Sequence, residues 1–134
     1  MALKVELKPG ERFILGDSVI TNDKQRTRLY VEGDAPILRE KDILRAEDAV
    51  TPCKKIYLVV QMMYLSPDPQ QHHQTYFALV GDLIAAAPSM AAYIDRVNNF
   101  ILTDSYYKAL KEAQAMIVHE GKLLANAQCS SSVQ

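Results

Sequence analysis

The sequence has few of the residues that build covalent or metal-linked frameworks. Its only cysteines are Cys53 and Cys129, too few for a disulfide framework and not spaced as paired metal ligands. Glycine and proline are also scarce, with five and six among 134 residues. Because 49% of the residues are hydrophobic and 23% are charged, the composition is that of a folded globular protein of one ordinary domain or two very small ones.

Targeting segments and strong charge of one sign are absent as well. The start, MALKVELKPGE, has no long apolar run behind a basic segment, so we expect no secretory signal, no membrane association and a cytoplasmic location. The formal net charge of −1 argues against indiscriminate nucleic-acid binding over the whole surface. Residues 1–45 contain nine Lys and Arg against eight Asp and Glu, so any RNA contact is expected to be local.

The motifs of common enzyme classes are missing. The sequence contains no GxGxxG, GxxxxGK[ST], HExxH or GxSxG pattern, which leaves nucleotide-phosphate, zinc-protease and serine-hydrolase chemistry without local support. His72 and His73 are adjacent, so on a helix they point about 100° apart and do not form an i, i+4 metal pair. We therefore expect no enzyme, no metal and no cofactor.

Short strands are indicated before residue 40, where apolar residues alternate with polar ones and turn residues recur. The predicted strands are Leu3–Leu7, Arg12–Leu15, Ser18–Thr21, Arg26–Glu32 and Ile37–Arg39. The predicted breaks are Pro9-Gly10, Gly16-Asp17, Asn22-Asp23 and Gly33-Asp34.

Beyond residue 46 the apolar residues recur at intervals of three and four, which predicts about four amphipathic helices. Thr51-Pro52 has the pattern of a helix start. A second helix ends before Pro88, a third runs over residues 89–102, and a fourth begins near Thr103 or Asp104 and fades near Asn126. The sequence thus predicts an α+β protein with a small antiparallel β-sheet over residues 1–45, a helical region over 46–126 and a flexible tail over 127–134.

One predicted strand has a face suited to RNA. Alternation places Arg26, Arg28, Tyr30 and Glu32 on one face, with the two arginines about 7 Å apart. Basic groups beside an aromatic ring are what single-stranded RNA requires for its phosphates and unstacked bases. The alternative is that both arginines are solvated strand residues that pair with acidic neighbours at positions 23, 32 or 34.

The order of segments resembles one known family over nearly the whole chain. The segments are MALKVELKPGERFILGDSVITN, RTRLYVEGDAPILREKDIL, PCKKIYLVVQMMYL, HQTYFALV and YKALKEA, and together they are similar to FlbT, a family of flagellum biosynthesis regulators. The resemblance implies post-transcriptional control of flagellin synthesis through the 5′ untranslated leader of flagellin mRNA. It also implies the flagellar regulator FlaF as a protein partner.

The first third also resembles, remotely, the dimeric RNA-binding regulator CsrA. The shared residues include Gly10-Glu11, Gly16-Asp17, Arg28-Leu29 and Arg39-Glu40. The resemblance implies a CsrA-like β-sheet with Arg39 in the RNA site, while the basic pair before the first turn becomes Leu7 and Lys8 here. The candidate RNA-binding residues are therefore Lys8, Arg26, Arg28, Tyr30 and Arg39.

Two functions are open at this point. The first is an RNA-binding regulator, expected as a homodimer, whose helices supply the dimer contact or a docking face. The second is an adaptor or chaperone-like module that acts through FlaF or flagellin without touching RNA. In the second case the helix face with Val59, Met62, Met63 and Tyr64 would bind the partner, unless those residues form the protein's own core.

Overall fold

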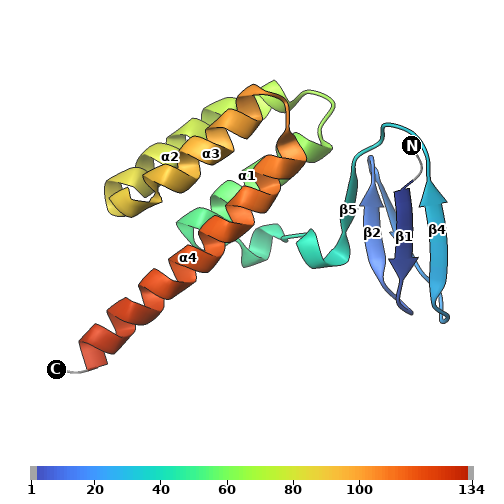
Figure 1. Cartoon of the computed structure of the whole chain (residues 1–134), viewed down its shortest axis with the longest axis horizontal. Helices are drawn as coiled ribbons and strands as arrows, with labels where there is room; N and C mark the ends of the chain where they lie inside the picture. Colours follow the sequence, from blue (N-terminus) through green and yellow to red (C-terminus); the bar gives the residue numbers. More distant parts are fainter. Residues whose placement is uncertain (1–2, 133–134) are drawn as a thin grey trace. The chain divides into compact units, whose positions relative to one another are not determined.

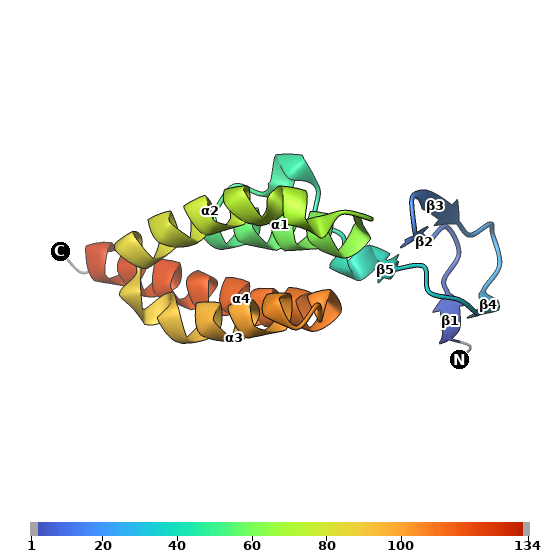
Figure 2. The ribbon, with the colours of Figure 1, turned by 90° about the horizontal axis from the view of Figure 1, so that it is seen from above.

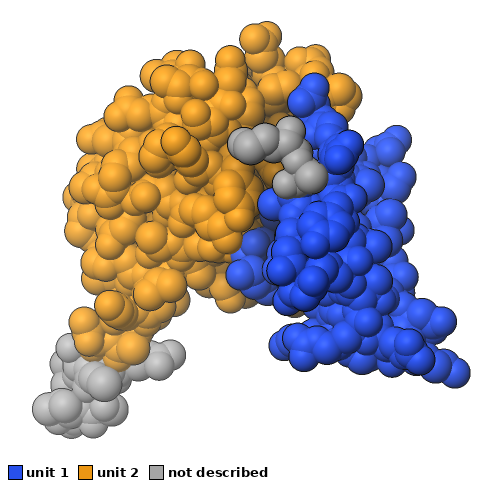
Figure 3. Space-filling model, turned by 45° about the vertical axis from the view of Figure 1, so that its right-hand side comes forward, with its two compact units in different colours: residues 1–43 blue, residues 44–134 orange. Residues whose placement is uncertain are grey.

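The computed structural model describes residues 3–132, with side chains described for residues 3–126. The chain forms two compact units, residues 1–43 and residues 44–134 (Figure 3). Within the described residues the first unit contains the β-strands and the second contains the α-helices, which confirms the predicted α+β class. The expected flexible tail, residues 127–134, falls outside the residues whose side chains are described.

The first unit consists of five short strands arranged as two antiparallel sheets. The strands are β1 (Leu3–Leu7), β2 (Arg12–Leu15), β3 (Ser18–Thr21), β4 (Thr27–Val31) and β5 (Ile37–Arg39), and all five are labelled in Figure 2. Figure 1 shows four of them, β1, β2, β4 and β5, from the side. One sheet pairs β1 with β4, and the other has the order β3-β2-β5. Four of the five predicted strands have the observed bounds, and β4 is one residue shorter at each end.

The core of this unit lies between the two sheets. Val5 and Leu7 of β1 and Phe13 of β2 are almost completely buried, and half-buried apolar residues of the other strands pack against them. Burial of a side chain such as that of Leu7 or Phe13 contributes about 1.5–3 kcal/mol. Because side chains alternate along a strand, the inward position of Val5 and Leu7 fixes Lys4 and Glu6 on the opposite, solvent-facing side of β1.

The turns of the first unit are held by glycine and by one asparagine. Gly10 has φ +75° and Gly16 has φ +63°, values that side-chain-bearing residues rarely adopt. The Asn22 side-chain amide donates to the carbonyl oxygens of Lys8 (2.8 Å) and Gln25 (2.9 Å). Asn22 therefore fixes the end of β1 against the segment that leads into β4.

The second unit contains four α-helices, which agrees with the predicted number. They are α1 (Pro52–Leu65), α2 (His73–Ala86), α3 (Ala91–Leu102) and α4 (Tyr106–Ser132). As predicted, Thr51 is the N-cap of α1, where its side-chain oxygen accepts from the Lys54 amide (3.3 Å). Figure 2 shows two pairs of helices, α1 with α2 and α3 with α4. The two pairs are joined because α1 also packs on α4.

A buried carboxylate joins α4 to the start of α1. Glu120 of α4 is buried, and it accepts hydrogen bonds from the Thr51 hydroxyl and from the Cys53 amide (3.1 Å). One of the amide groups that an isolated helix leaves unpaired at its N-terminus is thereby satisfied. Burial and the nearby Glu120 carboxylate raise the pKa of the Cys53 thiol to about 12.

The fourth helix begins later than its sequence pattern predicts. Thr103 and Asp104 were the expected caps, but α4 starts at Tyr106. Asp104 adopts φ +57°, the left-handed conformation of a residue in a tight turn. The Ser105 carbonyl instead accepts the first bond of the helix, from the Ala109 amide (3.0 Å).

Candidate nucleic-acid interface

The candidate interface lies on the solvent-facing side of the sheet formed by β1 and β4. Antiparallel register places Lys4 opposite Tyr30 and Glu6 opposite Arg28, with all four side chains exposed. Tyr30 is 64% exposed, so its ring is accessible to a ligand. We call this surface, made of Lys4, Glu6, Arg28 and Tyr30 together with Arg26 just before β4, the β1–β4 outer face.

The alternation expected for β4 is confirmed by burial. Arg28 and Tyr30 are exposed, whereas Thr27, Leu29 and Val31 are partly buried toward the sheet interior. Glu6, Arg26 and Arg28 also line a shallow cavity of about 330 Å³. The two predicted arginines therefore lie beside one concave part of the surface.

The acidic partner of this surface is Glu6, and not residue 23, 32 or 34 as the solvated-strand alternative expected. The Lys4 ammonium lies 3.4 Å and the Arg28 guanidinium 3.3 Å from the same carboxylate oxygen, Oε1 of Glu6. Both cations lower the pKa of Glu6 below its ordinary value, and Lys4 has the larger effect. Arg26 makes no hydrogen bond or ion pair with any residue that the structure describes.

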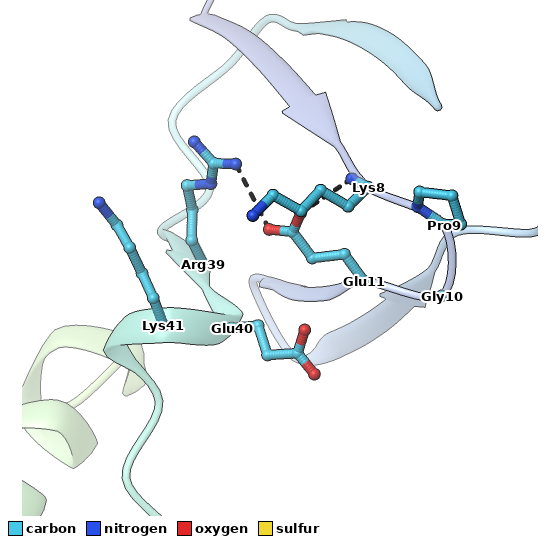
Figure 4. A pocket seen from close by; sticks show the side chains of 7 residues that line it. All are labelled: Lys8, Pro9, Gly10, Glu11, Arg39, Glu40 and Lys41. Carbon is cyan, nitrogen blue, oxygen red and sulfur yellow. Dashed lines mark hydrogen bonds and ion pairs between the residues drawn. The ribbon is translucent and has the colours of Figure 1, made fainter. Parts of the chain in front are cut away.

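The other two predicted basic residues, Lys8 and Arg39, meet at a second place on the same unit. Together with five neighbours they line a cavity of about 470 Å³ (Figure 4). The lining residues are Lys8, Pro9, Gly10, Glu11, Arg39, Glu40 and Lys41. Three cations face two carboxylates here, so the charge of this cavity is close to balanced.

Arg39 holds the strand unit together. Its Nη2 donates to the Glu6 carbonyl oxygen of β1 (2.7 Å) and to Glu11 Oε2 (3.3 Å). Since Arg39 belongs to the β3-β2-β5 sheet, its guanidinium links the two sheets. The Lys8 backbone amide donates to the other Glu11 oxygen (2.9 Å), and this bond, with Arg39, lowers the pKa of Glu11. The predicted RNA-contact residue Arg39 thus has a structural role that the sequence did not reveal.

Sequence reasoning missed several charged residues around the predicted ones. Lys4 and Glu6 belong to the β1–β4 outer face, and Glu11 and Lys41 belong to the cavity of Lys8 and Arg39. A signal for the first two was present, because Lys4, Glu6 and Lys8 alternate with the apolar Val5 and Leu7. Which strand lies opposite them, however, follows only from the observed pairing.

Leu7 also explains a departure from the CsrA pattern. This position corresponds to a basic residue in CsrA, and here Leu7 is 2% exposed and belongs to the core. Its side chain cannot reach an RNA phosphate. Any RNA contact of β1 must come from the residues on the other face of the strand.

The histidines and the possible metal ligands of the described residues are scattered. There is no group of three or more His, Cys, Asp or Glu side chains in that part of the chain that could hold a metal ion. His119 stacks on Tyr93, with ring centroids 5.2 Å apart, and so takes part in packing. None of the described helices is long and apolar enough to cross a membrane.

Half of the partner-binding face that the adaptor hypothesis requires is internal. Val59 and Met63 are 7% and 1% exposed and belong to the helical core. Met62 is exposed, and the Tyr64 ring packs against Tyr107 with centroids 5.7 Å apart. The alternative interpretation, ordinary core packing, is therefore correct for Val59 and Met63.

Taken together, these features define a small α+β protein with a strand unit that presents ion-paired basic residues and an exposed tyrosine, and a helical unit with its own core. Comparison with known proteins identifies its family. Residues 3–124 match the family described as flagellar protein FlbT, and the chain belongs to this family. The resemblance predicted from the sequence is thus confirmed.

Individual relatives agree with this assignment. The chain is 57% identical to the probable flagellum biosynthesis repressor protein FlbT 1 of Bradyrhizobium diazoefficiens, over 92% of this chain and 85% of that protein. It is 51% identical to the probable repressor FlbT of Rhodopseudomonas palustris, covering 93% and 99%. It is 30% identical to the flagellum biosynthesis repressor protein FlbT of Caulobacter vibrioides, covering 94% and 92%. No solved structure matches the chain.

Proposed function

We propose that this protein regulates flagellum biosynthesis after transcription, by binding the 5′ untranslated leader of flagellin mRNA and altering its translation or lifetime. The observation that carries the proposal is the β1–β4 outer face, where Lys4 lies opposite the exposed Tyr30, and where Arg26 and Arg28 line one cavity with Glu6. The names of the relatives, which include the words flagellum biosynthesis repressor, support the biological process and a repressing effect.

The chemistry of this face fits a single strand better than a duplex. Guanidinium and ammonium groups neutralise phosphates and release counterions, which gives affinity that falls with salt. The Tyr30 ring offers a plane on which an unpaired base can stack, a contact worth about 1–3 kcal/mol in single-strand binders. We therefore expect recognition of an unpaired loop in the leader.

A gel-shift titration against flagellin leader RNA tests the proposal. We expect the Arg26→Ala/Arg28→Ala variant to bind RNA more weakly by a factor of about ten or more. The slope of the logarithm of the binding constant against the logarithm of the salt concentration should become shallower by about 1.4, which is about 0.7 for each lost phosphate contact. The control is Arg45→Ala/Arg96→Ala, which removes the same charge from two arginines of the helical unit. Absence of binding by the unaltered protein refutes the mechanism, and equal binding by the first variant refutes the assigned face.

The rival proposal is an adaptor that acts through FlaF or flagellin. The exposed Met62 of α1 and its near neighbour Tyr64 are what remains of the predicted docking face. Co-purification of such a partner that persists after nuclease treatment, and that Met62→Glu abolishes, supports the adaptor. Association that nuclease removes supports the RNA mechanism.

The homodimer expected from the CsrA resemblance belongs to the same proposal. The mass of the protein in solution, measured alone and with leader RNA, reports oligomeric state and RNA capture in one experiment. A twofold mass without RNA supports the dimer.

A further inference from the structure

The carboxylate of Glu6 occupies an unusual position on the β1–β4 outer face. Its single oxygen Oε1 lies 3.4 Å from Lys4 Nζ and 3.3 Å from Arg28 Nη2, so two cations from neighbouring strands converge on one anionic oxygen. Among the salt bridges of the described residues, this is the one carboxylate that two basic side chains share. A phosphate oxygen of a nucleic acid would be held at the same point by the same two groups.

All three side chains remain in contact with water. Lys4 is 50%, Glu6 51% and Arg28 57% exposed, so the carboxylate can rotate away without leaving a charge buried and unpaired. Exposed ion pairs of this kind are individually weak. The Glu6 carboxylate is therefore a displaceable occupant of the cation pair.

The fold keeps Glu6 at this position by means that do not involve its carboxylate. Val5 and Leu7 on either side are buried, which fixes the direction of the Glu6 side chain. The Glu6 carbonyl oxygen accepts from Arg39 Nη2 (2.7 Å). A substitution that changes only the side-chain charge therefore leaves these anchors in place.

We propose that Glu6 is a competing anion that lowers the affinity of the RNA face, because it occupies the position of a phosphate between Lys4 and Arg28. This inference rests on the proposed RNA-binding function. An unrelated RNA that binds here replaces the Glu6 carboxylate with a phosphate, so this contact adds little to its affinity. The leader must offset the displacement of Glu6 through further contacts, for which Arg26 and the exposed Tyr30 are placed. Glu6 thereby lowers affinity for every RNA that reaches this cation pair, so that binding requires an RNA that also makes the further contacts.

The Glu6→Gln variant isolates this effect, because glutamine keeps the shape of the side chain and removes its charge. We expect its affinity for an unrelated single-stranded RNA, such as oligouridylate, to rise about three- to tenfold, given the weakness of exposed ion pairs. Its affinity for the leader should rise by a similar factor, because the leader displaces the same carboxylate. Thermal unfolding of both proteins verifies that the variant is folded.

Glu32→Gln is the matched control. Glu32 is exposed, follows β4 and makes no ion pair within the described residues, so its replacement changes net charge equally without freeing a cation pair. Equal gains for both variants, or no gain for Glu6→Gln while the unaltered protein binds the leader, overturn the role of Glu6 and leave the proposed function standing. Failure of the unaltered protein and of Glu6→Gln to bind any RNA overturns the proposed function and the inference with it.

Discussion

Individual arginines of the strand unit have different tasks, although the sequence groups them together. Arg28 is exposed and shares Glu6 with Lys4, whereas Arg39 donates to the backbone of another sheet. The alternation of polar and apolar residues predicted the exposure of Arg28 correctly. It could not predict the contacts of Arg39 with Glu6 and Glu11, because these depend on how two sheets with a sequence separation of about thirty residues come together.

Removal of the Arg39 guanidinium should therefore weaken the strand unit. We expect Arg39→Ala to lower the free energy of unfolding of this unit by about 1–2 kcal/mol, since it loses two hydrogen bonds at a partly exposed site. Urea unfolding followed through the amide NMR signals of the strands measures this change. Lys41 lines the same cavity, and its side chain makes no hydrogen bond or ion pair with the described residues. Lys41→Ala should therefore change stability by less than about 0.5 kcal/mol. Equal effects of the two substitutions would contradict the linking role.

Glu120 links two elements of the helical unit, as Arg39 links the two sheets of the strand unit. Glu120→Gln should lower the stability of the helices by about 1–3 kcal/mol, because an amide cannot accept well from both Thr51 and the Cys53 amide in a buried position. Chemical unfolding monitored by circular dichroism at 222 nm measures this loss. Glu112→Gln breaks a more exposed ion pair with Arg96 and should cost less than about 1 kcal/mol. A Glu112→Gln protein less stable than the Glu120→Gln protein would show that the bonds of Glu120 to the start of α1 contribute little to the stability of the helices.

At the scale of strands and helices, most of the fold could be predicted from local patterns. The strands follow period-two alternation, and Pro52 after Thr51 marks the start of α1. The start of α4 was placed too early, because Thr103, Asp104 and Ser105 are all chemically suitable caps. The left-handed conformation of Asp104 places this residue in the turn between α3 and α4, and the chemistry of a possible cap does not predict that conformation.

Two glycines in different elements should respond in opposite directions to the same substitution. Gly10 has φ +75° in the turn between β1 and β2, so Gly10→Ala is expected to destabilise the strand unit by about 1 kcal/mol or more through backbone strain alone. Gly81 lies within α2 with open space where a Cβ would point, so Gly81→Ala should stabilise the helices by up to about 1 kcal/mol. Thermal unfolding of both variants provides the comparison. A stabilised Gly10→Ala protein would show that the turn relaxes to another conformation.

Over the whole molecule, the groups with shifted pKa values are divided between the two units. Glu6 and Glu11 of the strand unit have lowered pKa values, for Glu6 chiefly because of Lys4 and for Glu11 chiefly because of the Lys8 backbone amide. A carboxyl group whose pKa is lowered in the folded state contributes to stability. This contribution is fully present when the pH is above the ordinary pKa, here 4.5, and is lost as the pH falls through the lowered pKa. Acidification below about pH 4.5 should therefore weaken the ion pairs of the strand unit.

The helical unit has the opposite dependence on pH. Burial raises the pKa of Cys53 from 9.0 to about 12 and also raises the pKa of Tyr76, so the neutral forms of both groups are favoured in the folded state. Their contribution to stability is fully present below the ordinary values and is lost as the pH rises through the raised ones. Above about pH 9 we therefore expect the helices to lose stability before the strands.

Methyl NMR spectra of strand residues such as Val5 and Leu7, together with circular dichroism at 222 nm, separate the two units between pH 7 and pH 11. Cys53→Ala removes one of the titrating groups, so stability should fall less steeply with pH in this variant, whatever its stability at pH 7. The slope is the decisive quantity, because the small cavity left by the substitution lowers stability equally at every pH. Loss of the strand signals before those of the helices above pH 9, or an unchanged slope in Cys53→Ala, would show that burial of these groups does not govern the alkaline limit.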